Sequence, residues 1–242
     1  MKFALLSDIH GNYEALTQVL HDLENQKVDK VHCLGDVIGY GADPVACLET
    51  VSKHCDIKLM GNHEYAALGL VSTDHYNTAA KESSEWTKAQ LSDNELSLIA
   101  DFEMSRSFDN FYFVHASPFE PDQWRYIIAP NAAIEGFMHF DGKICFNGHT
   151  HLPQIFIEQE DALPRCQIGH DFLPAPENRY IINVGSVGQP RDNDNRACYL
   201  IFDTDEYEVI YRRVEYDIAT TQTKMAELQM PELLINRLAI GR

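Results

Sequence analysis

The chain opens with Lys2-Phe3-Ala4-Leu5-Leu6-Ser7-Asp8-Ile9-His10-Gly11, an apolar run that passes directly into a polar loop. The run predicts a buried strand, and the regularly spaced apolar residues of 13–23 predict a helix after the loop. A second strand is predicted at 30–34, a helix begins at Asp43-Pro44, and a third strand spans 55–60. This alternation indicates crossover units and a mainly parallel sheet in the first half of the chain.

The rest of the chain changes from helical to strand-like patterns. Residues 64–105 are mostly helical in pattern, and Ser92-Asp93-Asn94-Glu95 has the spacing of a capping box. Strand-like runs follow at 111–115, 143–146, 154–157, 180–184, 197–202 and 208–213, before a helix at about 217–229 and a short final helix. Because no repeat or linker divides the sequence, we expect one domain over 1–242 with a mostly helical covering insertion at about 65–105.

The composition is that of a globular protein, with 242 residues of which 45% are hydrophobic and 10% aromatic. It excludes the collagen-like, disordered and mini-protein classes. The formal net charge is −18, from 19 Lys and Arg against 37 Asp and Glu, which disfavours long nucleic acid as a partner. A small phosphorylated substrate stays open, because cations bound to some carboxylates would offset their charge.

No run approaches the roughly 20 apolar residues of a membrane helix, and the first residues lack a signal-peptide pattern. We therefore expect a cytoplasmic protein with no membrane partner. The six cysteines include no C-x-x-C pair, so reduced packing residues are the favoured interpretation. The oligomeric state is left open, a homo-oligomer included.

Four polar loops each follow a predicted strand directly: Asp8-Ile9-His10, Gly35-Asp36, Gly61-Asn62-His63-Glu64 and Gly148-His149-Thr150-His151. His115 also ends a predicted strand. Taken singly, each residue has an ordinary explanation as a helix cap, a turn former or a loop residue. Ligands of an α/β sheet bind outside the carboxyl ends of its strands, however, and five ordered elements at such ends are hard to obtain by chance.

The residue types in these loops suit metal ions. Oxygen donors are mixed with imidazoles, in the set Asp8, His10, Asp36, Asn62, His115, His149 and His151. Such a mixture suits manganese, iron, zinc or nickel better than calcium or thiolate-bound zinc. Seven ligands are too many for one ion with an open position, so the count favours two adjacent ions.

The ordered motifs Asp-x-His, Gly-Asp, Gly-Asn-His-Glu, a strand-end His and Gly-His-x-His resemble the calcineurin-like metallophosphoesterase superfamily along nearly the whole chain. The segment 183–191, Asn-Val-Gly-Ser-Val-Gly-Gln-Pro-Arg, is similar to the small stand-alone bacterial phosphodiesterase branch. The resemblance implies an α/β fold, a four-layer α-β-β-α sandwich of two mixed sheets, with a binuclear metal site at the strand carboxyl ends.

The resemblance also implies roles for the residues. One metal ion would be held by Asp8, His10, Asp36 and His151, and the second by Asn62, His115, His149 and the shared Asp36. A hydroxide bridging the two ions would attack phosphorus in line, and His63 would protonate the departing oxygen. Arg191 has two open interpretations, a contact to the substrate phosphate or a surface loop residue. For Glu64 we favour a place at the start of a helix over a role in orienting His63.

The function expected from this resemblance is metal-dependent hydrolysis of a small phosphodiester. A phosphomonoesterase or a dinucleoside-polyphosphate hydrolase would use the same ions and acid, so both stay open. The protein phosphatase branch is disfavoured because its Asp-Arg pair after Gly-Asp is missing from Gly35-Asp36-Val37-Ile38-Gly39. A noncatalytic scaffold is disfavoured because His63 and every expected ligand are present.

Other aromatic and imidazole side chains have less definite places. In the insertion, Tyr65, Tyr76 and Trp86 are available to stack on a nucleobase, but core packing is the preferred interpretation. Six histidines lie outside the motifs and are expected on the surface or in packing positions: His21, His32, His54, His75, His139 and His170.

Overall fold

Strand β1 (Lys2–Leu6) lies in the middle of the first sheet of the computed structural model, which describes residues 1–74 and 76–242. The sheet has the strand order β11-β10-β1-β2-β3. Strands β2 (Lys30–Cys33) and β3 (Ile57–Lys58) run parallel to β1, linked by α1 (Tyr13–Gln26) and α2 (Pro44–His54). On its other side β1 pairs antiparallel with β10 (Ala197–Asp203), which forms a hairpin with β11 (Glu208–Val214).

The second sheet has the strand order β4-β5-β6-β9-β7-β8. Its parallel centre is formed by β5 (Phe111–Val114), β6 (Ile144–Asn147) and β9 (Tyr180–Asn183). The flanking strands β4 (Ser105–Phe108), β7 (Gln154–Ile157) and β8 (Arg165–Ile168) pair antiparallel with their neighbours. Both sheets are therefore mixed, as the family resemblance implied.

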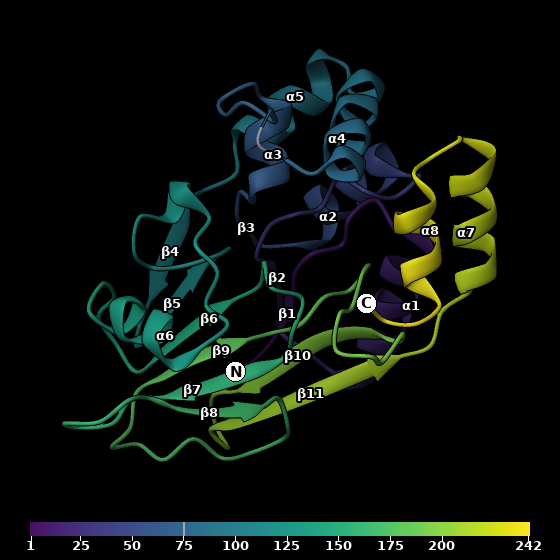
Figure 1. Ribbon diagram of the computed structural model, residues 1–242. Coiled ribbons are helices and arrows are strands. Elements are labelled where there is room, and N and C mark those ends of the chain that lie inside the picture. The colour runs from purple at the N-terminus through teal and green to yellow at the C-terminus, as the bar shows by residue number, and fades with distance from the viewer. Residues whose placement is uncertain (75) are drawn as a thin grey trace.

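The alternation of side chains along β1 explains the layers. Phe3 and Leu5 point into a core shared by the two sheets, whereas Ala4 and Leu6 point toward the apolar faces of α1 and α2. The far face of the second sheet packs on α6 (Pro130–Phe137). Helices thus cover the outer face of each sheet, which gives the predicted four layers (Figure 1).

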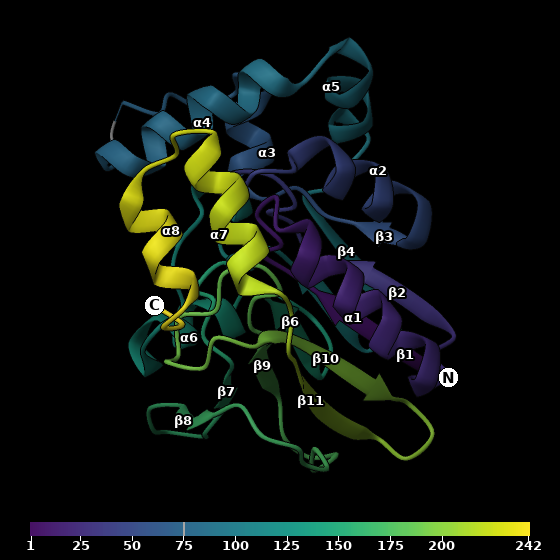
Figure 2. The ribbon, with the colours of Figure 1, turned by 90° about the vertical axis from the view of Figure 1, so that its right-hand side faces the viewer.

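The remaining helices gather near one end of the strands. In Figures 1 and 2, α3 (Asn62–Ala67), α4 (Thr78–Gln90) and α5 (Asp93–Ala100) lie together at the top of the molecule. Helices α7 (Ile218–Glu227) and α8 (Glu232–Leu238) pack on each other, and α7 also packs on α1. Within the described ranges, no helix has both the length and the apolar character needed to cross a bilayer.

Most predicted elements are present, and the differences concern weakly patterned segments. The third strand pairs over two residues only, although 55–60 was expected, and β4, β8 and α6 were not predicted. The capping box of α5 is confirmed, since Ser92 caps the helix and the Glu95 carboxylate accepts from the Ser92 backbone N–H at 2.8 Å. All six cysteines are free thiols, and five of them are buried. His75 lies outside the described residues.

Candidate metal centre

The five predicted elements converge at one edge of the two sheets. Hydrogen bonds join the loop after β1 to the loop after β2: Asp8 N donates to Gly35 O at 3.0 Å, and His10 N donates to Asp36 O at 2.9 Å. Gly148 N donates to His115 O at 2.8 Å, which joins the ends of β5 and β6. The parallel pairing of the strands therefore continues into the loops and brings their polar side chains together.

Five of the seven predicted ligands have left-handed backbone conformations. Asp8, His10, Asp36, His149 and His151 have φ values of 54°, 50°, 52°, 67° and 61°. L residues adopt this region rarely and at a cost, and such residues cluster at functional sites. In these loops the surrounding hydrogen bonds fix a strained backbone that aims the side chains into one space.

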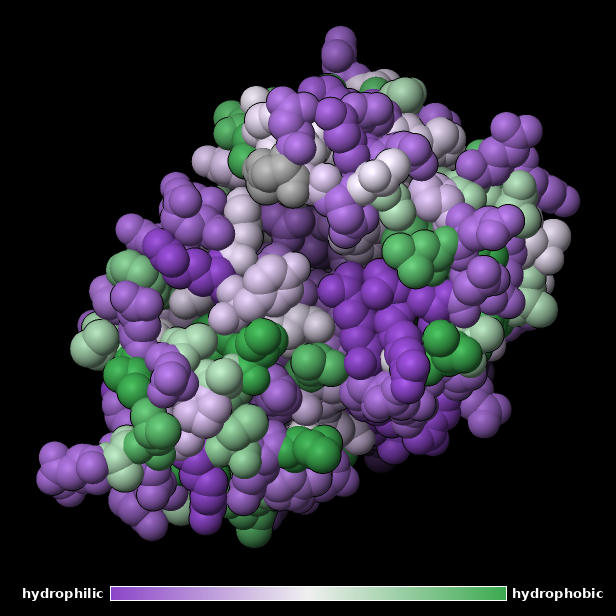
Figure 3. Space-filling model, viewed as in Figure 1, coloured by the Kyte–Doolittle hydropathy of each residue, from purple (hydrophilic) through white to green (hydrophobic). Residues whose placement is uncertain are grey.

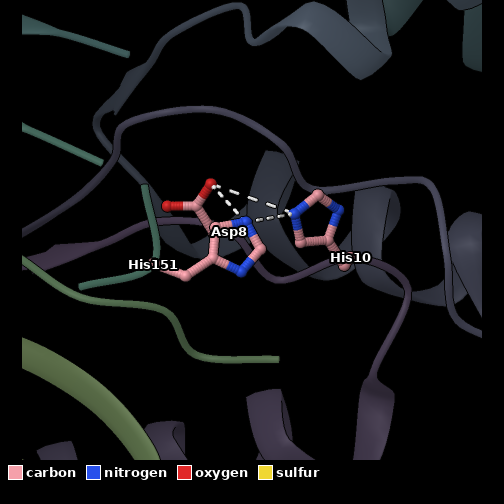
Figure 4. Close-up of side chains that lie close together, drawn as sticks. All are labelled: Asp8, His10 and His151. Carbon is pink, nitrogen blue, oxygen red and sulfur yellow. Dashed lines mark hydrogen bonds and ion pairs between the residues drawn. The ribbon is translucent and has the colours of Figure 1, made fainter. Parts of the chain in front are cut away.

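Asp8, His10 and His151 form the first group of candidate ligands (Figure 4). The Nε2 atoms of His10 and His151 are 3.0 Å apart, and Asp8 Oδ1 lies 3.3 Å from His151 Nε2. Each ring donates its Nδ1 hydrogen to a backbone carbonyl, His10 to Ile38 O and His151 to Gln189 O. Both Nε2 atoms therefore present lone pairs to each other beside a carboxylate, which is the arrangement that a metal cation stabilises.

Asp36, His115 and His149 form the second group. His115 Nε2 lies 3.3 Å from Asp36 Oδ2 and 3.2 Å from His149 Nδ1, while His115 Nδ1 donates to Leu34 O at 2.8 Å. Asn62 adds an amide oxygen that is buried and has no hydrogen-bond partner among the described residues. An uncompensated buried oxygen beside imidazole lone pairs fits an ion held at this point.

Asp36 lies between the two groups. Its Oδ2 is 3.7 Å from His10 Nε2 and 3.3 Å from His115 Nε2, and its Oδ1 accepts from His63 N at 3.0 Å. Burial opposes ionisation of Asp36, but His115 and His63 hold its pKa well below the usual range. One ionised carboxylate can therefore contact cations on both sides.

The electrostatics favour cations at this site. Burial raises the pKa of Asp8 to about 7 and lowers the pKa of His10 and of His151 well below the usual value. Burial also lowers the pKa of His115, but Asp36 outweighs that effect and raises it to about 9. Asp36 and His115 therefore favour positive charge in the space between them, and the residues present fit a metal ion there.

His63 lies at the same centre, on the first turn of α3. Ligand atoms of His10, Asp36 and His63 all lie within 4.8 Å of one another, and the His63 ring packs 4.5 Å from the ring of Tyr40. A side chain on Gly39, whose φ is +88°, would collide with the His63 imidazole. Burial lowers the pKa of His63. The geometry therefore allows His63 to act as a ligand or as a proton donor.

Glu64 does more than begin a helix. It stands in the first turn of α3, as we favoured, but it is completely buried and its carboxylate accepts four backbone N–H groups. These donors are Asp36 N, Val37 N, Ile38 N and Gly61 N, at 2.8–3.1 Å. Glu64 thereby ties the loop after β2 to the loop after β3. The sequence offered one signal for this role, a carboxylate next to the candidate ligands.

The segment 183–191 performs a similar task on the other side of the centre. Asn183 Nδ2 donates to Gly148 O and to Thr150 Oγ1, and Ser186 Oγ donates to Asp8 O at 2.8 Å. The sequence identified this segment as a family marker only. In the structure its buried polar side chains hold the loops of Asp8 and His149 in place.

A pocket of about 380 Å³ opens beside Asn62 and His149. Its aromatic lining residues are Tyr40, Tyr76, Trp124 and Tyr126. Among the three aromatic candidates in the insertion, only Tyr76 lines this pocket, because Tyr65 packs 5.3 Å from Trp124 in the core and Trp86 packs beside α7 and α8. The contributions of Tyr40, Trp124 and Tyr126 were missed. Figure 3 shows a hollow in the middle of this face.

Arg191 and the remaining histidines are also placed. Arg191 is half-buried, and its Nη2 donates to Gln189 Oε1 at 3.0 Å. His32 is buried between the rings of Phe3 and Phe113, as expected of a packing residue. The other described histidines outside the motifs are exposed: His21, His54, His139 and His170.

Residues 1–207 match the calcineurin-like phosphoesterase superfamily domain. An uncharacterized protein of Methanocaldococcus jannaschii is 37% identical over 243 residues, which cover 99% of this chain and 98% of that protein. A metallophosphoesterase from Sphaerobacter thermophilus has a similar crystal structure, with a TM-score of 0.87, 40% identity and coverage of 100% of this chain and 99% of that one. A hypothetical protein from Pyrococcus horikoshii shares the fold at 17% identity, with a TM-score of 0.80 over 100% of this chain and 98% of that one. The chain therefore belongs to the calcineurin-like phosphoesterase superfamily, whose members are metal-dependent.

Proposed function

We propose that this protein is a phosphodiesterase that hydrolyses a small phosphodiester with the help of two divalent metal ions. The observation that carries the proposal is the position of Asp36, whose Oδ2 lies within 3.7 Å of His10 Nε2 and 3.3 Å of His115 Nε2. One carboxylate between two groups of ligands is the arrangement of a two-metal site. Its chemistry is displacement at phosphorus in line with the leaving oxygen.

The ligands divide into two sets that share Asp36. Asp8, His10 and His151 complete the first set, and Asn62, His115 and His149 complete the second. Carboxylate, amide and imidazole donors suit manganese, iron, zinc or nickel. When bound, such ions act as Lewis acids that neutralise the phosphoryl oxygens and make water a nucleophile near neutral pH.

The pocket beside the centre supports a diester over a monoester. A diester carries a substituent on each side of the phosphorus, and the pocket of about 380 Å³ next to Asn62 and His149 gives one of them a place. The ring of Tyr126 lies 4.1 Å from that of His149, so a planar substituent can stack near the second ligand set. Part of the pocket wall comes from Val71, Tyr76 and other residues of the 65–105 segment, which we propose covers the site.

The first test compares esters with the same leaving group. Metal-loaded protein should hydrolyse bis-p-nitrophenyl phosphate faster than p-nitrophenyl phosphate, and a chelator should abolish both activities. Faster turnover of the monoester would refute the diester preference. Activity that survives complete removal of metal would refute the two-metal proposal.

The second test concerns His63, which we assign as the proton donor to the leaving oxygen. His63→Asn should keep the metal content and lose about 10²–10⁴-fold in turnover of alkyl esters, but much less with nitrophenyl esters, whose leaving group needs little protonation. His21→Asn, on the exposed surface of α1, is the matched control and should change neither property. Loss of metal in the His63 variant would show that it is a ligand. Equal losses for both ester classes would also refute the donor role.

A further inference from the structure

Two half-buried arginines beside the metal centre have no Asp or Glu partner within the described part of the chain. The half-buried arginines are Arg179, Arg191, Arg212, Arg213 and Arg237. Arg179 pairs with Glu158, Arg212 with Asp22 and Arg213 with Asp192, but Arg191 and Arg237 form no ion pair with Asp or Glu. Arg237 Nε donates instead to the main-chain oxygen of Arg242. The chain has 37 acidic residues for 19 basic ones, so a shortage of carboxylates does not explain this difference. Partly desolvated cations are normally paired, which suggests that these two bind an external anion.

Gln189 holds the two guanidinium groups next to each other. Its Oε1 accepts from Arg191 Nη2 at 3.0 Å and from Arg237 Nη1 at 3.0 Å. Burial and the neighbouring Arg191 both lower the pKa of Arg237. The arrangement therefore brings two like charges together around one neutral acceptor, and an anion would relieve their repulsion.

The donors of the pair are not all used. Arg191 Nε is buried and lacks a hydrogen-bond partner in the described structure. The nearest carboxylate in sequence, that of Asp192, is bound by Arg213. A buried N–H of a guanidinium without an acceptor is costly, so an acceptor supplied by a ligand fits this position.

The pair lies at the border between the metal centre and the aromatic pocket. The Arg191 guanidinium donates hydrogen bonds to the hydroxyls of Tyr40 and Tyr126, which line the pocket. Gln189 O accepts from Nδ1 of His151, a candidate ligand of the first set, at 2.5 Å. Arg237 comes from α8, which lies on the right-hand side of the molecule in Figure 1. In Figure 3, strongly hydrophilic surface borders the hollow on the side of α8.

We propose that Arg191 and Arg237 bind a second phosphoryl group of the substrate, one that is not cleaved. This inference rests on the proposed function, because the metal centre holds the phosphoryl group that reacts. Guanidinium groups bind phosphate through charge-assisted hydrogen bonds, and two of them share the Gln189 Oε1 acceptor here. The substrate class is therefore a small phosphodiester that carries an additional phosphate, placed where the metal centre meets the aromatic pocket.

The test compares two ligands that differ by one phosphate. Thymidine 5′-monophosphate and thymidine 3′,5′-bisphosphate are titrated into the metal-loaded protein, and the ratio of their dissociation constants is measured by calorimetry. We expect the bisphosphate to bind about 10–100-fold more tightly than the monophosphate, because its second phosphate adds a charge-assisted contact. In Arg237→Gln the ratio should fall toward one, with the affinity for the monophosphate unchanged. Arg165→Gln, which alters an exposed arginine of β8, should keep the ratio of the wild type.

A kinetic comparison adds a second readout. The p-nitrophenyl ester of thymidine 5′-phosphate is used with and without a 3′-phosphate, so that the scissile bond and the leaving group stay the same. Arg237→Gln should raise KM for the 3′-phosphorylated ester alone and leave kcat of both unchanged, and Arg237→Lys should restore part of the loss. Equal affinities of the wild type for the two nucleotides, or an equal loss for both in Arg237→Gln, would overturn the inference. A protein that hydrolyses neither ester but keeps the affinity ratio would refute the proposed function alone.

Discussion

Replacement of Glu64 by glutamine tests whether this carboxylate holds the metal loops together. Oε2 accepts from Asp36 N and Gly61 N, and Oε1 accepts from Val37 N and Ile38 N. Glutamine has one oxygen and one NH2 group, so in either amide orientation two buried N–H groups lose their acceptor and face another donor. At about 1–3 kcal/mol for each unsatisfied buried group, the free energy of unfolding should fall by about 2–6 kcal/mol.

The assay is urea unfolding in the presence of a chelator, which separates loop stability from metal binding. Glu95→Gln is the matched control, because Glu95 holds the same position in α5 but is half-buried and its hydrogen bonds are to its own helix cap, Ser92. We expect the control to lose less than about 1 kcal/mol. The metal affinity of Glu64→Gln should also fall, by about 10–100-fold, since residues that orient ligands have effects of this size. A loss of stability no larger than that of the control would refute the role given to Glu64.

Three further predictions concern the metal, the pH and the packing of a loop. If the two-metal proposal is right, Asp36→Asn should reduce the bound metal from two ions to fewer than one per chain in elemental analysis after dialysis, because both proposed ligand sets share this carboxylate. Burial lowers the pKa of His32 to about 4, so this imidazole takes up a proton more readily in the unfolded chain than in the folded one. The wild type should therefore lose about 3 kcal/mol of unfolding free energy as the pH falls from about 6.5 to about 4, and His32→Phe should flatten this slope in urea titrations at several pH values. Gly148→Ala should lower the unfolding free energy by about 1–3 kcal/mol and release metal, because the added Cβ would meet Ser7 Oγ and the Asp8 carboxylate.

The sequence predicted the central strands of both sheets and also β11, but it missed the two edge strands of the second sheet. Strands β4 and β8 lie at the two ends of the second sheet, and most of their residues are exposed. An edge strand with polar side chains has little apolar alternation, so its sequence resembles a loop. The third strand was predicted too long because the apolar residues of 55–60 extend beyond its paired part. Strand β3 is the edge of the first sheet, and only Ile57 and Lys58 pair with β2.

The candidate ligands could be predicted because each follows a strand directly, and strand ends share one edge of a sheet. The pocket could not be predicted in the same way. Trp124 and Tyr126 belong to an irregular segment after β5, and they meet Asn62 and Tyr76 only through tertiary packing. Periodicity shows that a side chain is buried, but not which distant segment it packs against. The same reason explains why the contacts of Arg237 with Gln189 were not foreseen.

The site combines three buried carboxylates that have separate tasks. Asp8 and Asp36 face imidazole nitrogens, whereas all the nearest donors to Glu64 are backbone N–H groups, so its oxygens are already used. The hydrogen bonds of Glu64, Asn183 and Ser186 join the loops through atoms that are not candidate ligands. We therefore expect these bonds to keep the loops in place when the cations are removed. From this it follows that the metal-free protein keeps its fold but gains stability when a divalent ion binds, by an amount that grows with the ion concentration.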